Sequence, residues 1–414
     1  MNVLVLGHGG REHALVDALH RSDQVKHIFV LNGNPGMLKL AKPLFGSEDV
    51  AHIVSLCKKH HIEMVIPGGE TYLTEGVADT LHEEGITCFG PKKNASLIES
   101  SKAYAKSIME TYQVPTGAYQ VFHDYENAYA YVKTYKPPYV IKYDGLAFGK
   151  GVTIAKTLDE AKDVLYDLLV NHVYGQGKVI IEEFLEGEEY SMICMVHHET
   201  IVPLPLAKDH KPRYEKNKGP NTGGMGAYSP VDFVDEKTKA QSLEMMRKVA
   251  LGMVKEGNPF TGFLYGGFIL TKDGPKIIEF NCRLGDPEAE VILPKIKSDL
   301  VHSIKRVLDH ETFEIDVFET YHLGFVMVSD GYPGTYLKKQ PLEIKTEIED
   351  EIYHMGTILE DGKLLTNGGR VLFIRGQGNT LEEARLHAYK KVSYIKADHL
   401  LYRHDIGKKQ ADLD

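Results

Sequence analysis

The chain has 414 residues, 43% of them hydrophobic and 26% charged, and its formal net charge at pH 7 is −10. This length predicts about two to four globular domains, and the acidic balance argues against a nucleic-acid-binding surface, which needs a basic face. No apolar stretch reaches the roughly 18 residues of a membrane span. The four cysteines are scattered without a C-x-x-C motif, so we expect reduced thiols and a cytoplasmic location.

The first hundred residues alternate short apolar strands with helices. Strands are predicted at 3–6, 27–31, 63–67 and 86–90, and helices at 11–20 and 71–84. This alternation is typical of a parallel α/β domain, whose ligands bind beyond the carboxyl ends of the strands. A further helix at 102–112 ends before Val114-Pro115.

A glycine-rich turn, Gly7-His8-Gly9-Gly10-Arg11-Glu12, follows the first strand and opens the first helix. Glu12 stands where a dinucleotide fingerprint has its third glycine, and the second strand ends at Asn32 without a carboxylate for a ribose, so the motif disfavours NAD. A helix N-terminus with two glycines and an arginine suits a phosphate group. A tight packing turn explains the motif equally well.

Residues 119–200 have the pattern of a small α+β unit. Strands are predicted at 139–142, 152–155 and 179–185, and helices at 124–135 and 158–171. The first strand leads Lys142 into a loop that contains Gly145, Gly149, Lys150 and Gly151. Glycines allow backbone N–H groups to close around an anion, and the lysines add charge. Because a Walker motif opens a helix instead, this segment predicts a lid over the triphosphate of ATP.

The remaining chain contains a long loop, a helix and a hairpin. We expect residues 208–230 to form an irregular loop of a length that is often functional. A helix follows at 236–256, and then a hairpin of strands 263–270 and 276–281. Residues 320–414 predict short strands, Gly-rich turns and a helix at 381–396.

Two strand ends offer ligands for a nucleotide and its metal. Glu279 and Asn281 share one face of a strand while Phe280 faces the core, and oxygen donors of this kind suit Mg²⁺. Arg283 follows as a candidate phosphate ligand. The strand that ends near residue 185, with the acidic segment 186–189 after it, could bind adenine and ribose, although a solvated acidic turn is the simpler interpretation.

Two other carboxylates have simple structural explanations. Asp286 precedes Pro287 and predicts a helix N-cap with proline at the first position; a role as a site residue is the second interpretation. Glu70 follows a parallel strand, where it either faces a ligand or stabilises a helix N-terminus. The 20 histidines show no H-E-x-x-H or other metal-binding spacing.

Taken together, these stretches resemble the glycinamide ribonucleotide synthetase family of ATP-grasp enzymes over essentially the whole chain. The most specific pieces are Asp209-His210-Lys211, the segment 219–230 and the segment 279–288; the turn at 7–14 and Thr366-Asn367-Gly368-Gly369-Arg370 are also similar. This sequence departs from the family pattern at Gly69, Ser100, Tyr143, Phe148 and Pro212.

The resemblance implies roles for individual residues. Catalytic positions would be Lys142, Lys150, Arg283, Asn221, Thr222, Gly223 and Gly224. ATP would contact Lys102, Lys142, Gly145, Gly149, Lys150, Gly151, Glu182, Glu183, Phe184, Leu185 and Glu189. The substrate side would hold Gly9, Gly10, Arg11, Glu70 and Asp209, and Mg²⁺ or Mn²⁺ would bind Glu279 and Asn281.

The resemblance also implies an architecture and a reaction. We expect an α/β and α+β multidomain protein: an N-terminal parallel α/β domain at 1–101, an ATP-grasp domain at 102–317 with a lid at about 119–190, and a C-terminal α+β domain at 318–414. ATP would drive ligation of glycine to 5-phosphoribosylamine through glycyl phosphate. The protein would act as a monomer, or a weak dimer, without nucleic acid or membrane partners. The alternatives are an ATP-grasp ligase for another acceptor and a non-catalytic nucleotide-binding protein.

Overall fold

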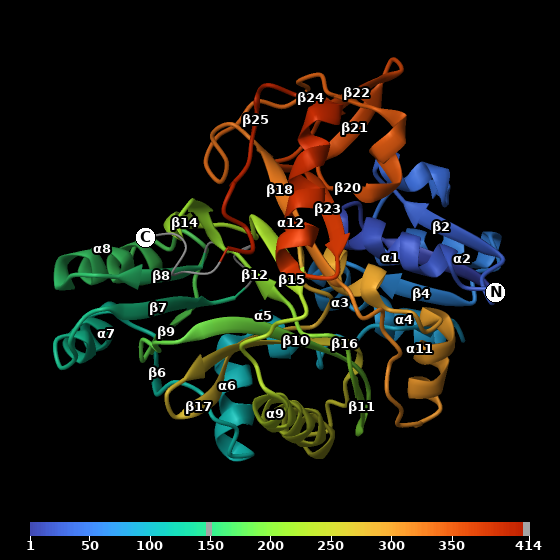
Figure 1. The fold of residues 1–414 in the computed structure, drawn as a ribbon. Helices are drawn as coiled ribbons and strands as arrows, with labels where there is room; N and C mark the ends of the chain where they lie inside the picture. Colours follow the sequence, from blue (N-terminus) through green and yellow to red (C-terminus); the bar gives the residue numbers. More distant parts are fainter. Residues whose placement is uncertain (146–150, 409–414) are drawn as a thin grey trace.

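The N-terminal part of the chain is a parallel sheet in the order β3-β2-β1-β4-β5. The computed structural model describes residues 1–145 and 151–408 (Figure 1). The strands of this sheet are β1 (Asn2–Leu6), β2 (His27–Leu31), β3 (Lys42–Leu44), β4 (Met64–Pro67) and β5 (Thr87–Cys88). The order reverses between β1 and β4, and such a switch point opens a crevice at the carboxyl ends of the strands.

Helices cover both faces of this sheet, which explains why β1 is apolar at every position from Val3 to Leu6. Val3 and Val5 belong to one hydrophobic cluster with α1 (Gly10–His20), and Leu4 and Leu6 belong to another with α2 (Val50–Lys59) and α4 (Val77–Glu83). Strands buried on both faces lose the polar alternation of a half-exposed strand. The predicted helix at 71–84 is wrong in one respect, because it is two helices. Gly76 adopts φ +88° between α3 (Glu70–Thr74) and α4, a conformation that breaks the helix.

The middle of the chain forms an antiparallel sheet in the order β11-β10-β16-β17. Its strands are β10 (Glu188–His197), β11 (Thr200–Pro203), β16 (Thr261–Thr271) and β17 (Gly274–Asn281). One face packs against α9 (Glu236–Lys255) through residues such as Met246, and α6 (Lys102–Thr111) lies beside α9. The short helices α5 (Leu97–Ser100) and α10 (Ala289–Ile292) and the longer α11 (Leu300–Leu308) connect this part to its neighbours.

The expected lid is a separate sheet with a hydrophobic cluster of its own. The sheet runs in the order β6-β9-β7-β8. Its strands are β6 (Tyr119–Phe122), β7 (Tyr139–Asp144), β8 (Val152–Ala155) and β9 (Lys178–Glu182), and its helices are α7 (Tyr125–Val132) and α8 (Leu158–Leu169). The cluster contains Ile141, Tyr143 and Leu165 but no residue of the other two clusters. Figure 1 shows this unit projecting to one side.

The C-terminal part is built on a sheet that also takes strands from the middle of the chain. Its order is β12-β15-β18-β23-β20, with β25 (Leu400–Leu401) paired to β18. The strands are β12 (Lys208–Asp209), β15 (Gly226–Ser229), β18 (Tyr321–Ser329), β20 (Ile352–His354) and β23 (Arg370–Gly378), and α12 (Leu381–Lys390) packs on the sheet. Three separate two-stranded sheets accompany this sheet: β13 (Pro212–Tyr214) with β14 (Lys218–Asn221), β19 (Glu343–Ile344) with β24 (Ile395–Lys396), and β21 (Thr357–Glu360) with β22 (Lys363–Thr366).

The expectation of an irregular loop at 208–230 is therefore wrong. Gly226 to Ser229 pair with Phe325 to His322 of β18, so the segment is held by backbone hydrogen bonds to a strand far along the chain. Gly226 has φ +158° and lies against the Gly324 carbonyl. The pairing explains why a glycine-rich stretch, which predicts a loop on local grounds, is ordered as a strand.

Asn34 connects the first glycine turn to the C-terminal part. Its Nδ2 donates to the His8 carbonyl and to the His354 carbonyl, each at 2.8 Å. The His354 N–H in turn donates to His13 Nδ1 at 2.9 Å. In the described residues, no helix has the length and apolar character needed to cross a membrane.

Candidate active site

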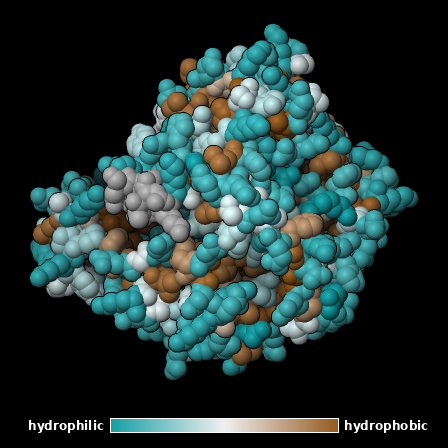
Figure 2. Space-filling view, in the orientation of Figure 1, coloured by the Kyte–Doolittle hydropathy of each residue, from teal (hydrophilic) through white to brown (hydrophobic). Residues whose placement is uncertain are grey.

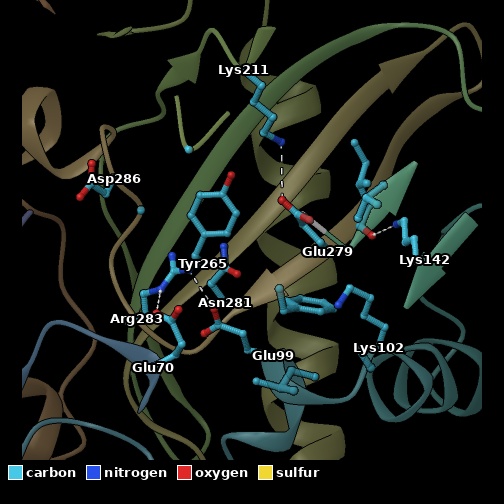
Figure 3. Close-up of a pocket in the computed structure, with 18 of the residues that line it drawn as sticks. Glu70, Glu99, Lys102, Lys142, Lys211, Tyr265, Glu279, Asn281, Arg283 and Asp286 are labelled. Carbon is cyan, nitrogen blue, oxygen red and sulfur yellow. Dashed lines mark hydrogen bonds and ion pairs between the residues drawn. The ribbon is translucent and has the colours of Figure 1, made fainter. Parts of the chain in front are cut away.

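A cavity of about 320 Å³ lies where the parts of the chain meet, and Figure 3 shows the side chains that point into it. It takes residues from α1, α6, the lid strand β7, the central strand β17 and the C-terminal strand β23. The predicted residues that line it are Arg11, Glu70, Lys102, Lys142, Gly145, Gly151, Glu182, Asp209, Thr222, Gly223, Glu279, Asn281 and Arg283.

The lid side of the cavity holds a buried group of two lysines and one glutamate. Glu182 Oε2 lies 2.9 Å from Lys142 Nζ and 3.2 Å from Lys106 Nζ. The exposed fractions of the three side chains are 6%, 3% and 2%. Burial lowers the pKa of Lys106 to about 8, against the opposing effect of Glu182. Lys102 is separate from this group: its Nζ donates to the Gly145 carbonyl at 3.0 Å, and burial lowers its pKa.

The central strand presents Glu279 and Asn281 from the same face, as the alternation predicts, while Phe280 is 3% exposed within the core. Lys211 Nζ lies 3.5 Å from Glu279 Oε1 and 3.1 Å from Glu189 Oε2. Lys211 lowers the pKa of Glu279 against the effect of burial. Although burial opposes it, the neighbouring carboxylates raise the pKa of Lys211 well above its usual value. This end of the cavity therefore keeps an ionised carboxylate next to a cation.

The opposite wall contains a network of arginines and glutamates. Arg283 Nε lies 3.2 Å from Glu70 Oε2, and Arg283 Nη2 lies 2.9 Å from Glu99 Oε1. Arg11 Nη2 is 3.8 Å from the same oxygen of Glu70. Burial alone would raise the pKa of Glu70, but Arg283 and Arg11 lower it to about 2. Arg283, expected to bind phosphate, already has two carboxylate partners.

Asp286 is not the N-cap of a helix, so that prediction is wrong. The next helix, α10, begins only at Ala289, and Glu288 precedes it. Asp286 Oδ1 instead lies 2.8 Å from Arg370 Nη1 of β23. The same arginine nitrogen donates to the Gly223 carbonyl at 2.7 Å. Asp286 thus belongs to an ion pair between the central and C-terminal parts, at the rim of the cavity.

Asp209 reaches the cavity from β12, next to a second carboxylate, Glu288. Burial raises the pKa of Asp209 to about 8; Lys211 opposes this effect, and Glu288 and Glu189 add to it. Glu288 accepts a hydrogen bond from Ser191 Oγ at 2.8 Å. A proton is therefore held on Asp209 at neutral pH, beside the ionised Glu279.

Some predicted residues lie outside the cavity wall, and two cannot be placed. Gly9 donates its N–H to Glu12 Oε2 at 2.7 Å, so Glu12 closes the turn at the position where a fingerprint has glycine. The other described residues that do not line the cavity are Gly10, Glu183, Phe184, Leu185, Glu189, Asn221 and Gly224. Gly149 and Lys150 lie outside the described residues.

The cavity also includes Asp286, whose second interpretation was a site residue, and residues that were not assigned to the site: Lys106, Lys211, Tyr265, Arg370, Glu99 and Glu288. Lys106 could have been found, since it stands four residues after Lys102 and shares its helix face. Lys211 lies within the Asp-His-Lys motif, two residues after Asp209. Arg370 lies within the family-like stretch 366–370, but nothing in that stretch shows that it reaches the cavity, because it enters from a distant strand.

Comparisons with known proteins agree along the whole chain. Family models match residues 1–99 (phosphoribosylglycinamide synthetase, N domain), 100–289 (phosphoribosylglycinamide synthetase, ATP-grasp (A) domain) and 322–409 (phosphoribosylglycinamide synthetase, C domain). The chain is 45% identical to a phosphoribosylamine–glycine ligase of Halalkalibacterium halodurans, covering 99% of this chain and 97% of that protein.

Solved structures show the same relationship. The phosphoribosylamine–glycine ligase of Thermotoga maritima superposes with a TM-score of 0.88 at 33% identity, over 98% of this chain and 100% of that one. The biotin carboxylase domain of Hydrogenobacter thermophilus 2-oxoglutarate carboxylase, solved with MgADP, has a TM-score of 0.72 at 16% identity, over 97% and 91% of the two chains. The latter likeness concerns the fold alone.

Proposed function

Because the chain belongs to the phosphoribosylglycinamide synthetase family, we propose that it ligates glycine to 5-phosphoribosylamine at the cavity described above. It is a ligase that forms a C–N bond in purine biosynthesis and consumes ATP. The glycine carboxylate attacks the γ-phosphate of ATP, which gives glycyl phosphate and ADP. The amine of phosphoribosylamine then displaces phosphate, which gives glycinamide ribonucleotide. The observation that carries the proposal is a single cavity lined by lysines, carboxylates and arginines from every part of the chain.

Lys102 and Lys142 would hold the nucleotide phosphates. Lys142 is buried and Lys102 half-buried in the cavity wall, and of the two only Lys142 is paired with Glu182. Fixed cations in a poorly solvated site stabilise the charge of a transferring phosphoryl group without reorganising. Gly145 and Gly151, on either side of residues 146–150, line the same space, and we propose that the segment between them, with Gly149 and Lys150, covers the triphosphate.

Glu279 and Asn281 have the chemistry of a Mg²⁺ or Mn²⁺ site. Both offer oxygen donors from one face of β17, and the lowered pKa of Glu279 keeps its carboxylate ionised. Gly267, opposite Glu279 on β16, contributes no carboxylate, so water would complete the coordination, as Mg²⁺ commonly accepts. The bound ion would neutralise charge on the ATP phosphates. Lys211, 3.5 Å from Glu279, provides positive charge at the same place from the protein itself.

The adenosine would lie along the strand end at 182–185, with Glu189 toward the ribose. Glu183 and Phe184 are exposed, and the backbone after β9 offers hydrogen-bonding groups beside the lid. Glu189 is paired with Lys211 at 3.1 Å, so ribose binding would compete with that ion pair.

The crevice at the switch point of the N-terminal sheet would hold phosphoribosylamine. Gly9, Gly10 and Arg11 begin α1, and a helix N-terminus attracts a phosphate group. Glu70, kept ionised by Arg283 and Arg11, faces the same crevice and would accept hydrogen bonds from ribose hydroxyls or the amine. Ligand binding at this place is the general property of such switch points.

The glycyl phosphate would form between these two regions, beside Thr222 and Gly223. Thr222 Oγ1 donates to the Lys211 carbonyl at 2.7 Å, and the Gly224 N–H donates to Thr222 Oγ1 at 3.0 Å. These bonds fix the segment from Asn221 to Gly224 above the metal-binding strand. Asp209, protonated at neutral pH, would donate a hydrogen bond to a substrate oxygen there without adding charge.

We further propose a cytoplasmic location and a monomeric state, with a weak dimer as the alternative. The four cysteines are free and buried, which fits a reducing compartment.

The decisive experiment measures ADP release with Mg-ATP and glycine, with and without freshly generated phosphoribosylamine. We expect fast release only when both substrates are present, together with glycinamide ribonucleotide in the mass spectrum. ADP release that needs bicarbonate or another acceptor would point instead to a different ATP-grasp ligase. Binding of ATP without turnover for any acceptor would support a non-catalytic role.

A further inference from the structure

Three histidines meet on the face of the central sheet that is covered by α11. His197 ends β10, His198 begins the turn into β11, and His310 follows α11. His310 is exposed, and His197 is half-buried. Figure 1 shows α11 beside the ends of these strands. The group lies at the opposite end of β10 from Glu188 and Glu189, so it is separate from the cavity.

The imidazole rings are close enough to share one ligand. One ring nitrogen from each histidine lies within 4.8 Å of the corresponding nitrogen of the other two. The ring centroids of His197 and His198 are 4.1 Å apart, and those of His197 and His310 are 4.7 Å apart. In the described part of the chain, no other group of three or more His, Cys, Asp or Glu donors converges in this way.

Two threonines hold the rings in place. His197 pairs across the sheet with Thr200 of β11 and Thr261 of β16, so the three side chains form a row on one face. His197 Nδ1 lies 3.0 Å from Thr261 Oγ1, and His310 Nδ1 lies 3.3 Å from Thr200 Oγ1. When a hydroxyl oxygen accepts from Nδ1–H, the other ring nitrogen, Nε2, carries a lone pair. Metal-binding histidines are commonly oriented by such a second hydrogen bond.

We propose that His197, His198 and His310 form a binding site for a transition-metal ion such as Zn²⁺, with Thr261 and Thr200 as supporting hydrogen-bond partners. Imidazole nitrogens suit Zn²⁺, Ni²⁺ and Cu²⁺ rather than Mg²⁺, so this site and the magnesium site select different ions. Zn–N bonds of about 2.0–2.1 Å place tetrahedral ligands about 3.4 Å apart. Side-chain rotation of His198 and of the exposed His310 supplies that closure, and water takes the remaining position.

A bound ion would join the end of α11 to the β10–β11 turn. His310 comes from the connection between the central and C-terminal parts of the chain, whereas His197 and His198 belong to the central sheet. An ion that binds the folded state but not the unfolded chain raises the free energy of unfolding by RT ln(1 + [ion]/Kd), so the temperature of unfolding rises with ion concentration. The ion would thus cross-link these two segments, and the fraction of chains that hold an ion would depend on the ion concentration.

The test is calorimetric titration of the full chain with Zn²⁺ in excess Mg²⁺, which blocks carboxylate sites. We expect one Zn²⁺ per chain, with affinity at least tenfold weaker in His198→Ala and in His310→Ala. His302→Ala, an exposed histidine on α11 itself, is the matched control and should bind as the parent does. Thr261→Val, which keeps the shape of the side chain, should weaken binding about 10–100-fold, as expected for a supporting partner.

Replacement of Zn²⁺ with Co²⁺ gives a second measurement, since tetrahedral nitrogen ligation produces a visible absorption band. The band should appear for the parent and for His302→Ala and be absent for His310→Ala, and circular dichroism should show all variants folded. Equal Zn²⁺ affinity in the parent, His198→Ala and His310→Ala would overturn the proposal, as would absence of Zn²⁺ binding to the parent.

Discussion

Replacing Glu182 with glutamine should destabilise the protein far more than the same change at its neighbour Glu183. Glu182 Oε2 compensates two buried lysines, at 2.9 and 3.2 Å, and breaking a buried ion pair by removal of one partner costs about 3–5 kcal/mol. Deprotonation of Lys106 limits the expected loss of unfolding free energy. Because the pKa of Lys106 is about 8, that lysine can release its proton at pH 7 for roughly 1.4 kcal/mol. We therefore expect a loss near the lower bound, about 3 kcal/mol.

Glu183→Gln is the matched control. Glu183 is exposed and lies 3.9 Å from Lys276, and surface pairs contribute about 0–1 kcal/mol. The assay is urea unfolding followed by circular dichroism, with catalysis left aside because Glu182 also lines the cavity. Equal midpoints for the two variants would refute the view that Glu182 compensates buried charge.

The pH dependence of the unfolding free energy provides an independent check, in which Glu182→Gln is compared with the parent. Without Glu182, the pKa of Lys106 falls below the value of about 8 that it has in the parent. At a pH between these two pKa values, Lys106 keeps its proton in the folded parent but has lost it in the folded Glu182→Gln variant. Stability rises with pH wherever the unfolded state binds more protons than the folded state, so the variant gains on the parent over this window. The difference in unfolding free energy should narrow as pH rises toward 8 and stay constant above it.

Three further changes test the site. Glu279→Gln should lower kcat at least ~100-fold, because the site loses the charge of its metal ligand. Circular dichroism should show an unaltered fold, and Glu236→Gln, at an exposed position of α9, should have the kcat of the parent. Undiminished ADP release by Glu279→Gln would contradict the metal assignment. Arg370→Ala should lower kcat/KM by up to about 100-fold, because the segment at Gly223, which Arg370 fixes at the cavity rim, would be misplaced. Arg385→Ala on α12 should leave steady-state kinetics unchanged. Equal kcat/KM values for the two variants would show that Arg370 has no role in the site. Asp209 holds a proton in the folded state up to about pH 8, whereas the unfolded chain loses that proton near the ordinary pKa of aspartate. The parent should therefore lose stability as pH rises from 5 to 8, and Asp209→Asn should lose less. Identical slopes of urea midpoint against pH for the two proteins would exclude a raised Asp209 pKa.

The elements whose order depends on local pattern were predictable from the sequence. Strand 27–31 and strand 152–155 have the predicted bounds, and the helix predicted at 236–256 ends one residue earlier, at Lys255. Apolar periodicity and caps act over a few residues, so a single chain segment carries the information. The same reasoning placed Glu279 and Asn281 on one face of β17, which the structure confirms.

What local pattern could not supply is the effect of distant partners. The segment 208–230 has the glycine content of a loop, yet its residues 226–229 form a strand that pairs with β18. Asp286 has the context of a helix cap, yet Arg370 of β23 binds it. Glu99 and Arg370 enter the cavity only after the chain has folded back on itself. Composition can indicate such residues as polar, but the ion pairs that give them a place in the site join residues 84 and 184 positions apart.

The pairing of β15 with β18 has a consequence for synthesis of the chain on the ribosome. Gly226 to Ser229 have β12 beside them on one edge, but their partners on the other edge, His322 to Phe325, come much later in the chain, so β15 has one unpaired edge while the intervening residues are translated. At 5–20 residues per second this takes roughly 5–18 s. A nascent chain at this stage also lacks Arg370, which donates to the Gly223 carbonyl in the complete fold. We therefore expect the cavity to be completed only after β18 and β23 have been translated and have joined the sheet.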